Sequence, residues 1–551
     1  MPKLSIDGQP VEVEEGATIL EAARKLGINI PTLCYRDGYE PPTSCMVCVV
    51  RVNGSEQLVP SCATQATEDM EVESETEHVR EARRMALELL LGDHTGDCIA
   101  PCQIACPAHL DIPGMIRLIQ SGRMDEAVAL VKERIALPAT LGRICPELCE
   151  KACRRGQVDA PVSIQLLNRF VGDYDRQSES RYTPECEPPT DQHVAVIGAG
   201  PAGLSAAYYL LQKGHCCTLF DDHDQPGGML RYGVSDADLP PDILDADIQP
   251  ILQMGTEFRG GIQVGADVMM DEIREEFDAV LVAAGELSDT EAAALDLPTS
   301  NRGLEADRGT QMAPADGVFV AGSALSPSQH AVRAVGSGRI AAEAIHQHLA
   351  AQEITVRHRP YTVTMRRLDD EELAHYAKNA SGDDRTSPGG GEKVGFSTDE
   401  ARREARRCLH CECAGLDKCR LRQWAMEYDA DIRRFRGERA KYRRDDTHPL
   451  VVYEPGKCIK CGLCVQIARR EQESLGLTFI GRGFNVEIGT PFDAPLREAF
   501  GDIVVECAEA CPTGALVLRE KTADGDTDTF EPVAPQKVNT DEIPANDVCN
   551  D

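Results

Sequence analysis

The stretch HVAVIGAGPAGLSAAYYLLQKGHCCTLFDD, residues 193–222, decides the fold of the central part of this chain. It contains an apolar strand, a glycine turn, a helix rich in small residues and a second strand, which is the order of a βαβ unit. Gly198 is expected to make the tight turn, Gly200 to let the backbone approach a pyrophosphate, and Gly203 to let helix pack on strand. The start of the helix then directs its partial positive charge at the phosphates. The sequence therefore predicts a Rossmann-type domain with a bound dinucleotide.

Two later stretches favour FAD as that dinucleotide. PGGMLRYGV (226–234) and GVFVAGSALSPSQHAVRAVGSGRIAAEAI (317–345) resemble flavin-binding segments of the glutamate synthase small subunit and its relatives. The resemblance implies an aspartate on the flavin ribityl chain where this chain has Ser323, so that contact is expected to be weakened or replaced. Asp221, at the end of the second strand, is placed to take a ribose hydroxyl. The residues expected to bind FAD are Gly198, Gly200, Pro201, Ala202, Gly203, Asp221, Gly227, Gly228, Met229, Gly322 and Ser323.

The spacing of these segments predicts that a second nucleotide domain is missing. The family that they resemble inserts an NADPH-binding Rossmann domain between two flavin segments. Here FDAVLVAAG ends at Gly285 and GVFVAG begins at Gly317, and the intervening stretch of about thirty residues is too short for a domain of ordinary size. The glycine cluster PGGGEKVG follows no expected strand and precedes no expected helix. We therefore expect no NAD(P) site in this chain.

The composition favours a metalloprotein from a reducing compartment. The 551 residues are too many for one core, and 23 of them are cysteines. The start MPKLSIDGQPVEVEEG lacks the apolar run of a secretory signal, and C-x2-C and C-x3-C spacings then favour metal binding over disulfides. A cytoplasmic location is expected. The net charge of -34 argues against nucleic acid or an anionic membrane as partner, and it fits either a salt-adapted source or a plain solubilising surface.

Four cysteines near the start are expected to hold a [2Fe-2S] cluster. Their C-x10-C-x2-C-x13-C spacing puts three thiols on one loop rich in Pro and Gly. Structural zinc is the alternative, although zinc favours two C-x2-C pairs and only one is present. Residues 1–97 resemble the N-terminal β-grasp ferredoxin domain of the large iron-sulfur subunit of complex I and of related hydrogenases and formate dehydrogenases. The four residues are Cys34, Cys45, Cys48 and Cys62.

A second group of six cysteines lies in a segment of helical periodicity. APCQIACPAHLDIPGMIRLIQSGRMDEAVALV and LGRICPELCEKACRRG resemble the helical domain of the glutamate synthase small subunit and of dihydropyrimidine dehydrogenase, over residues 98–175. That resemblance implies two [4Fe-4S] clusters, one held by Cys98, Cys102 and Cys153 and one by Cys106, Cys145 and Cys149. His94 is nearest to a position where the family has another cysteine, and related complex I subunits use a histidine there. Asn168 falls where the family has Gln or Glu. Both residues are also compatible with ordinary polar helix positions.

The last cysteines are expected to hold two further clusters. EARRCLHCECAGLDKCRLRQWA offers four thiols for a [4Fe-4S] cluster, with zinc as the alternative: Cys408, Cys411, Cys413 and Cys419. KCIKCGLCVQIA begins a ferredoxin motif, but Ala468 stands at its fourth position, and the second run keeps only Cys507 and Cys511. These losses agree with one surviving cluster, because the fourth cysteine of each run ligates the other cluster in two-cluster ferredoxins. Its expected ligands are Cys458, Cys461, Cys464 and Cys511, which leaves Cys507 as a buried thiol.

Together these patterns predict a multidomain chain of the α/β and α+β classes. The expected order is a β-grasp [2Fe-2S] domain (1–80), a helical [4Fe-4S] domain (81–185), a Rossmann-type FAD domain without an NAD(P) domain (190–350), a flexible linker (381–395), a ferredoxin-like [4Fe-4S] domain (396–520) and a disordered acidic tail (521–551). The expected cofactors are FAD, one [2Fe-2S] cluster and three to four [4Fe-4S] clusters.

The pattern contains no nucleophile-base pair and resembles glutamate synthase small-subunit-like iron-sulfur flavoproteins. Clusters carry single electrons, and flavin interconverts one- and two-electron chemistry. The expected function is therefore electron transfer within a larger oxidoreductase complex. Its partners would be redox subunits such as a nucleotide-oxidising flavoprotein, a formate dehydrogenase or a hydrogenase. A self-contained NAD(P)H dehydrogenase and a redox-sensing iron-sulfur protein are the alternatives.

Overall fold

The structure is a computed structural model that describes residues 1–356, 359–473 and 475–519, so the predicted acidic tail lies outside the described residues. The chain divides into two compact units. Unit 1 contains Met1–Ala100, Tyr361–Asn379 and the described residues from Cys411 onward, and unit 2 contains Pro101–Pro360 and Ala380–His410. Among the described residues, no helix combines the length and the apolar character that crossing a lipid bilayer requires.

The first part of unit 1 is a five-stranded sheet with one helix. Its strands are β1 (Lys3–Ile6), β2 (Gln9–Glu12), β3 (Val49–Val52), β4 (Val59–Pro60) and β5 (Glu71–Glu73), in the order β2-β1-β5-β3-β4. β1 and β2 form an antiparallel hairpin, whereas β1 runs parallel to β5. Helix α1 (Ile19–Lys25) begins at a capping box, in which Thr18 and Glu21 satisfy each other's backbone N–H groups. Its apolar face is buried in the same core as Leu4 and Ile6.

The rest of unit 1 combines helices with two short strand pairs. The helices are α2 (Glu77–Gly92), α15 (Asp370–Ala377), α17 (Arg420–Glu427), α18 (Leu463–Arg470), α19 (Leu496–Ala499) and α20 (Val504–Ala510). β13 (Val451–Tyr453) pairs antiparallel with β16 (Leu516–Leu518), and β14 (Thr478–Ile480) with β15 (Glu487–Gly489). The fully buried Arg83 of α2 donates to Val49 O of β3 at 2.9 Å and to the Tyr428 hydroxyl at 2.7 Å. Because a buried guanidinium needs acceptors, Arg83 fixes α2 between the sheet and the end of α17.

Unit 2 begins with a group of helices, as predicted. They are α3 (Pro101–Ala105), α4 (Ile112–Ser121), α5 (Met124–Lys132), α6 (Pro138–Ile144), α7 (Leu148–Lys151) and α8 (Ile164–Gln177), joined later in the chain by α16 (Thr398–Ala405). α6 and α8 approach closely, and two glycines without side chains make this possible. A Cβ on Gly142 would lie 2.5 Å from Arg169 Cα, and a Cβ on Gly172 would lie 2.5 Å from Ala139 N. A buried ion pair of 2.7 Å between Lys132 and Asp175 joins α5 to α8.

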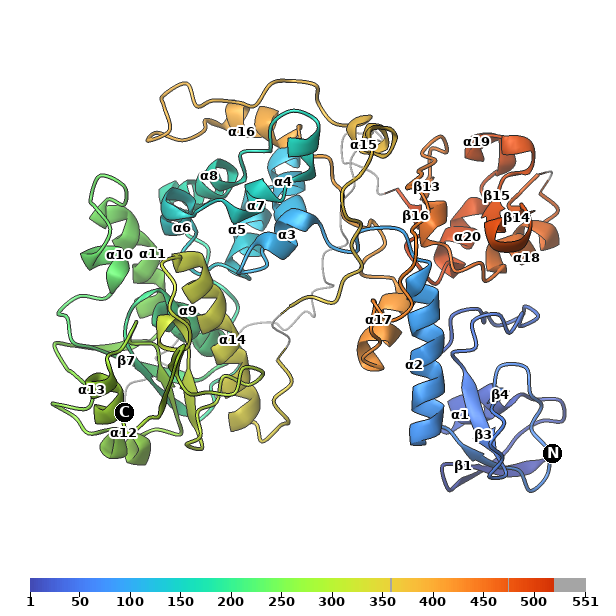
Figure 1. The fold of residues 1–551 in the computed structure, drawn as a ribbon, viewed down its shortest axis with the longest axis horizontal. Helices are drawn as coiled ribbons and strands as arrows, with labels where there is room; N and C mark the ends of the chain where they lie inside the picture. Colours follow the sequence, from blue (N-terminus) through green and yellow to red (C-terminus); the bar gives the residue numbers. More distant parts are fainter. Residues whose placement is uncertain (357–358, 474, 520–551) are drawn as a thin grey trace. The chain divides into compact units, whose positions relative to one another are not determined.

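A five-stranded parallel sheet forms the second half of unit 2. Its strands are β6 (His193–Ile197), β7 (Cys216–Asp221), β8 (Glu257–Gly260), β9 (Ala279–Val282) and β12 (Val318–Val320), in the order β12-β9-β6-β7-β8. Three neighbouring helices are α9 (Pro201–Gln212), α11 (Pro241–Gln253) and α14 (Ala331–Leu349), with the short α10 (Met229–Tyr232) and α12 (Met270–Glu276) between strands. Figure 1 shows α9 and α14 side by side. The apolar runs of β6 and β9 are buried throughout, as expected for central parallel strands.

Residues 286–316, all of which the structure describes, form only small elements. They contain α13 (Asp289–Ala294) and the two-residue strands β10 (Thr299–Ser300) and β11 (Gly303–Leu304). β10 pairs with β11 alone, apart from the parallel sheet. This stretch therefore packs beside β9 and β12 of the parallel sheet and does not form a βαβ unit of its own.

The segment 381–395 was expected to be a flexible linker, and its middle is packed instead. Thr386 is buried, and its N–H donates to the Glu404 carboxylate at 2.7 Å. The N–H of Gly389 donates to Glu400 at 2.7 Å. The one aliphatic side chain of the segment, Val394, is exposed, so polar bonds to α16 of the same unit hold the middle of the segment in place.

Candidate iron-sulfur and flavin sites

The four N-terminal thiols lie together in unit 1. The sulfurs of Cys34 and Cys45 are 3.4 Å apart, and those of Cys48 and Cys62 are also 3.4 Å apart. All four are buried and free of disulfides. The hydrogen bond with Cys45 lowers the pKa of Cys34 to about 6, and that with Cys62 lowers the pKa of Cys48 to about 7. Four convergent and buried sulfurs fit an iron-sulfur cluster with four thiolate ligands.

The predicted C-terminal set in unit 1 also comes together. Gly462, with φ 77°, lets the loop turn into α18, and this brings Cys464 into the first helical turn. Cys511 follows the end of α20. Burial raises the pKa of Cys458 to about 12, and the neighbouring Cys511 adds to that rise. The leftover Cys507 is fully buried and donates to Cys464 O at 3.7 Å, as expected for a structural thiol.

The N-terminal and C-terminal cysteine sets of unit 1 are neighbours. Burial and the other thiols of its own set raise the pKa of Cys461, and Cys34 of the N-terminal set contributes to the same rise. Beside them, Arg36 forms an ion pair of 3.0 Å with Glu506, and the Tyr39 hydroxyl donates to the same carboxylate at 2.8 Å. The N-terminal loop and α20 are therefore joined at the edge of both sites.

In unit 2, the structure brings together Cys106, Cys145 and Cys149, the predicted second helical set. Cys106 follows α3, Cys145 ends α6, and Cys149 lies in α7. Burial raises the pKa of Cys145 to about 11, with Cys106 contributing. Asn168 of α8 is buried; its Nδ2 donates to Pro138 O at 3.3 Å, while its Oδ1 has no hydrogen-bond partner among the described residues. A buried acceptor with no partner fits the fourth ligand position.

The remaining thiols are grouped differently from the prediction. Cys98 lies in unit 1, where its carbonyl O accepts from Cys413 N at 3.2 Å, and its own N–H donates to Val363 O at 3.1 Å. Cys419 is the other neighbour of this pair. Cys153 lies in unit 2, and its neighbouring thiol there is Cys408. The predicted set of Cys98, Cys102 and Cys153 is therefore divided between the units, with Cys98 in unit 1 and Cys102 and Cys153 in unit 2. Cys411 is buried in unit 1, near Tyr376.

His94, at the end of α2, has the properties of a neutral ligand. Its Nδ1 is buried and has no hydrogen-bond partner among the described residues. Burial, together with the nearby cation of Lys457, lowers the pKa of His94 to about 4. A neutral imidazole is the form that binds metal.

Sequence reasoning missed Lys457. Its side chain is 2% exposed, forms an ion pair with Glu454, and lies near Cys413 as well as His94. A buried cation beside thiolates offsets their negative charge. The available signal was its position directly before Cys458, although a lysine in such a loop is ordinarily exposed.

The glycine loop of the flavin site has the expected geometry. Gly198 has φ 104°, and a Cβ there would lie 2.5 Å from Ala283 O. A Cβ on Gly203 would overlap the Gly198 carbonyl oxygen, so α9 packs on β6 only without one. Gly200 is different, because the nearest atom to a Cβ there would be Gly228 Cα at 4.0 Å. The loop therefore keeps open space at Gly200, where a pyrophosphate would approach the N-terminus of α9.

The other predicted flavin residues surround this loop. The Asp221 carboxylate accepts from Ala199 N at 2.7 Å and from His223 N at 3.0 Å, which fixes it beside the loop. Gly227 N donates to Ala199 O at 2.9 Å. The remaining predicted residues come from three places in the chain. Pro201 and Ala202 begin α9, Gly228 and Met229 lie at the start of α10, and Gly322 and Ser323 follow β12.

Ser323 does not reproduce the aspartate of the resembled family. Its hydroxyl donates to Ser328 O at 3.1 Å. Gly322, with φ 65°, donates its N–H to the Ser337 hydroxyl at 2.9 Å. These bonds order the turn between β12 and α14 from within the chain.

Three family models match parts of the chain. Residues 2–77 match the 2Fe-2S iron-sulfur cluster binding domain, residues 64–180 match dihydropyrimidine dehydrogenase domain II, 4Fe-4S cluster, and residues 196–249 match the NAD(P)-binding Rossmann-like domain. The first two cover the N-terminal thiols and the helical thiols of unit 2. The third covers the glycine loop.

Curated relatives share about a third of the chain. The NADP(+)-dependent formate dehydrogenase subunit beta of Moorella thermoacetica is 42% identical over 207 residues, 34% of this chain and 29% of that protein. The NADPH-Fe(3+) oxidoreductase subunit beta of Geobacter sulfurreducens is 38% identical over 188 residues, 34% of this chain and 28% of that protein. The glutamate synthase [NADPH] small chain of Mycobacterium tuberculosis is 36% identical over 213 residues, 38% of this chain and 42% of that protein. The chain spans less than half the length of each of these relatives. It is a multidomain α/β protein with [2Fe-2S], [4Fe-4S] and Rossmann-like parts, and it is homologous to the glutamate synthase small chain and to the beta subunits of these two oxidoreductases.

Proposed function

We propose that this chain is an electron-transfer iron-sulfur flavoprotein subunit of a larger oxidoreductase complex. The observation that carries the proposal is that two cluster sites adjoin each other in unit 1 and that a cluster site adjoins the flavin domain in unit 2. In unit 1, Cys461 of the C-terminal set neighbours Cys34 of the N-terminal set. In unit 2, a Cβ on Gly336 of α14 would lie 2.7 Å from Pro107 O, the residue directly after Cys106. Iron-sulfur clusters pass single electrons and FAD exchanges them with two-electron donors when these groups are bound.

The chain's own residues have defined roles in this proposal. Buried thiols hold the clusters and exclude water from them, Asn168 and His94 supply the non-thiolate ligands, and Lys457 offsets the charge of its thiolate neighbours. The open loop at Gly200 and the N-terminus of α9 bind the pyrophosphate of FAD. We assign a β-grasp [2Fe-2S] domain to residues 1–80, a helical [4Fe-4S] domain to 81–185, the FAD domain to 190–350 and a ferredoxin-like domain to the block from 396.

Partner subunits complete the proposed reaction. The relatives' names point to formate or NADPH oxidation as the source or destination of electrons. A nucleotide-oxidising flavoprotein, a formate dehydrogenase or a hydrogenase-like subunit would bind this chain in the cytoplasm. The short elements of residues 286–316 support this division of labour, since they offer no second nucleotide-binding βαβ unit.

A self-contained NAD(P)H dehydrogenase is the second candidate, and the match of residues 196–249 to an NAD(P)-binding model favours it. Anaerobic titration of the partner-free chain separates the two functions. We expect dithionite to bleach flavin and cluster absorbance, and NADH or NADPH to bleach neither, with affinities no better than about millimolar, or a ΔG of about -4 kcal/mol. Stoichiometric bleaching by either nucleotide would overturn the relay function. Gly200→Ala is the matched control, since it is expected to lose FAD while its clusters still respond to dithionite.

A further inference from the structure

The segment Cys408–Cys419 contains four thiols in twelve positions, yet its two ends belong to different units. Cys408 belongs to unit 2, and Cys413 and Cys419 belong to unit 1. A single cluster on all four thiols would have to draw its ligands from both units. Within unit 2, Cys408 has a thiol neighbour from outside the segment, and within unit 1 so do Cys413 and Cys419.

In unit 1, Cys413 and Cys419 lie with Cys98. The N–H of Cys413 donates to Cys98 O at 3.2 Å, and Leu421, two residues after Cys419, donates its N–H to Pro512 O at 3.3 Å. Cys98, Cys413 and Cys419 are 8%, 7% and 6% exposed. A Cβ on Gly514 would overlap the Cys413 sulfur, so this sulfur is confined from that side. Burial, followed by the Cys413 thiol and then Cys98, raises the pKa of Cys419 to about 12.

His94 belongs to the same surroundings in unit 1. Lys457 neighbours both Cys413 and His94, which links the imidazole to the thiol group. Gly96, between His94 and Cys98, leaves room for the Lys457 side chain, because a Cβ there would lie 2.7 Å from Lys457 Cε. The buried Nδ1, which has no hydrogen-bond partner among the described residues, is therefore a candidate fourth donor beside the three sulfurs.

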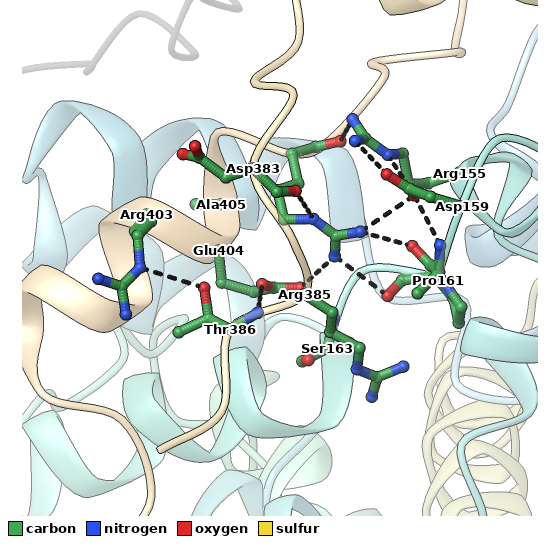
Figure 2. A network of polar contacts seen from close by, with 12 residues as sticks. Arg155, Asp159, Pro161, Ser163, Asp383, Arg385, Thr386, Arg403, Glu404 and Ala405 are labelled. Atoms are coloured by element: carbon green, nitrogen blue, oxygen red, sulfur yellow. Dashed lines mark hydrogen bonds and ion pairs between the residues drawn. The ribbon is translucent and has the colours of Figure 1, made fainter. Parts of the chain in front are cut away.

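In unit 2, two buried arginines fix Cys408 beside Cys153. Arg155, two residues after Cys153, donates from Nη1 to Arg407 O at 3.2 Å. Arg407, directly before Cys408, donates to Glu404 at 2.8 Å, to Ala160 O at 2.8 Å and to Asp159 at 3.1 Å. Asp159 also pairs with Arg155, so one carboxylate bridges both guanidinium groups. Figure 2 shows this network around Arg155, Asp159 and Glu404.

The network has a specific geometric effect. The bonds from Arg155 to Arg407 O and from Arg407 to Asp159 and to Ala160 O join the segment that follows Cys153 to the segment that precedes Cys408. The two guanidinium groups are almost entirely buried, with side-chain exposures of 3% and 0%. Buried guanidinium groups with several acceptors hold their surroundings in one arrangement. α3, which carries Cys102, packs against α7, which ends two residues before Cys153.

We propose that the Cys408–Cys419 segment serves two clusters: Cys408 joins Cys102 and Cys153 in unit 2, and Cys413 and Cys419 join Cys98 and His94 in unit 1. The Arg155–Asp159–Arg407 network is the positioning device for the first site. This proposal rests on the cluster-binding part of the proposed function. It changes which thiols share a cluster and leaves the number of clusters unchanged.

Four serine variants of the full chain test this assignment by iron analysis and low-temperature EPR of the dithionite-reduced protein. We expect Cys408→Ser and Cys153→Ser to change one and the same signal, and Cys413→Ser and Cys98→Ser to change a second signal. Each variant is expected to lose up to about four irons. The assignment is overturned if Cys408→Ser and Cys413→Ser change the same signal while Cys98→Ser behaves like Cys153→Ser. Cys186→Ser is the matched control, because this exposed cysteine lies outside every site.

A milder variant keeps the test decisive if a serine variant does not fold. Asp159→Asn retains the side-chain shape but removes the charge that bridges the two arginines. It is expected to alter the EPR line shape or midpoint potential of the signal that Cys153→Ser affects, and to leave the other signal unchanged. A change confined to the signal that Cys98→Ser affects would contradict the proposal. Complete lack of cluster signals in the wild-type chain would instead overturn the proposed function itself.

Discussion

Two glycines of the flavin loop are expected to respond in opposite ways to the same added methyl group. Gly200 has φ -79° and ψ -173°, a conformation that alanine adopts without strain. A Cβ there would meet only Gly228 Cα, at 4.0 Å. The same Cβ on Gly203 would overlap the Gly198 carbonyl oxygen, which is backbone and has little freedom to move.

The expected magnitudes follow from these surroundings. Gly200→Ala reduces the entropy of the unfolded chain, which stabilises by about 0.4–1 kcal/mol, and it loses a comparable amount because alanine is a poorer N-cap of α9. The apoprotein should therefore unfold within about 1 kcal/mol of wild type. Gly203→Ala overpacks α9 on β6 and should cost about 2 kcal/mol or more.

The two variants separate cofactor binding from folding. At Gly200 the methyl group enters the space where pyrophosphate approaches, so FAD affinity should fall at least about tenfold, or about 1.4 kcal/mol. The assays are denaturant unfolding of the FAD-stripped chain and fluorescence titration with FAD. If Gly200→Ala binds FAD as wild type does, the pyrophosphate does not pass this loop. If Gly203→Ala is as stable as wild type, the account of helix packing is wrong.

Three further predictions concern titration, ligation and metal content. Burial raises the pKa of Asp247 to about 6, against about 3.9 in the unfolded chain. The folded state therefore binds the proton more tightly, and the free energy of unfolding falls by up to about 3 kcal/mol as pH rises from 4 to 6. Asp247→Asn should remove this loss in unfolding curves measured across that range. The His94→Ala variant should lose one EPR signal or make it labile. The His94→Cys variant should retain the cluster at a lower midpoint potential, because a thiolate is more negative than imidazole. An unchanged iron content and unchanged EPR signals in His94→Ala would contradict ligation by His94. Anaerobically prepared protein should contain about 18 irons and no zinc, and fewer than about ten would remove at least two clusters from the assignment.

Local patterns were the part of this molecule that the sequence predicted well. The βαβ unit from β6 to β7 depends on residues near one another in the chain, so its apolar runs and its glycine turn suffice to predict it. The Cys106, Cys145 and Cys149 group was predicted from a resemblance, and helices α3, α6 and α7 carry its three members. The glycine roles at positions 198, 200 and 203 follow from backbone space alone, which is why the motif was informative.

Long-range placement could not be predicted in the same way. The neighbours of Cys98 and Cys153 come from the segment beyond residue 400, and no local pattern records which of two units a cysteine joins. The packing of Thr386 on Glu404 depends on hydrogen bonds between polar residues. A polar composition is also typical of linkers, so the composition of this segment predicted a linker. The buried Lys457 was missed for a related reason, because its burial arises only when Gly96 and Cys413 are brought beside it.

The wide separation of Cys98 from Cys413 along the chain sets an order of biogenesis. The thiols of Cys34, Cys45, Cys48 and Cys62 all leave the ribosome within the first part of synthesis, so their cluster can be inserted early. The site that joins Cys98 to Cys413 and Cys419 is incomplete until synthesis has reached Cys419. During that interval Cys98 and His94 are exposed to oxidants and to competing metals, since the residues that bury them have not yet been synthesised. If iron becomes limiting late in synthesis, the protein should therefore retain the N-terminal cluster and lack the cluster assigned to Cys98, Cys413 and Cys419.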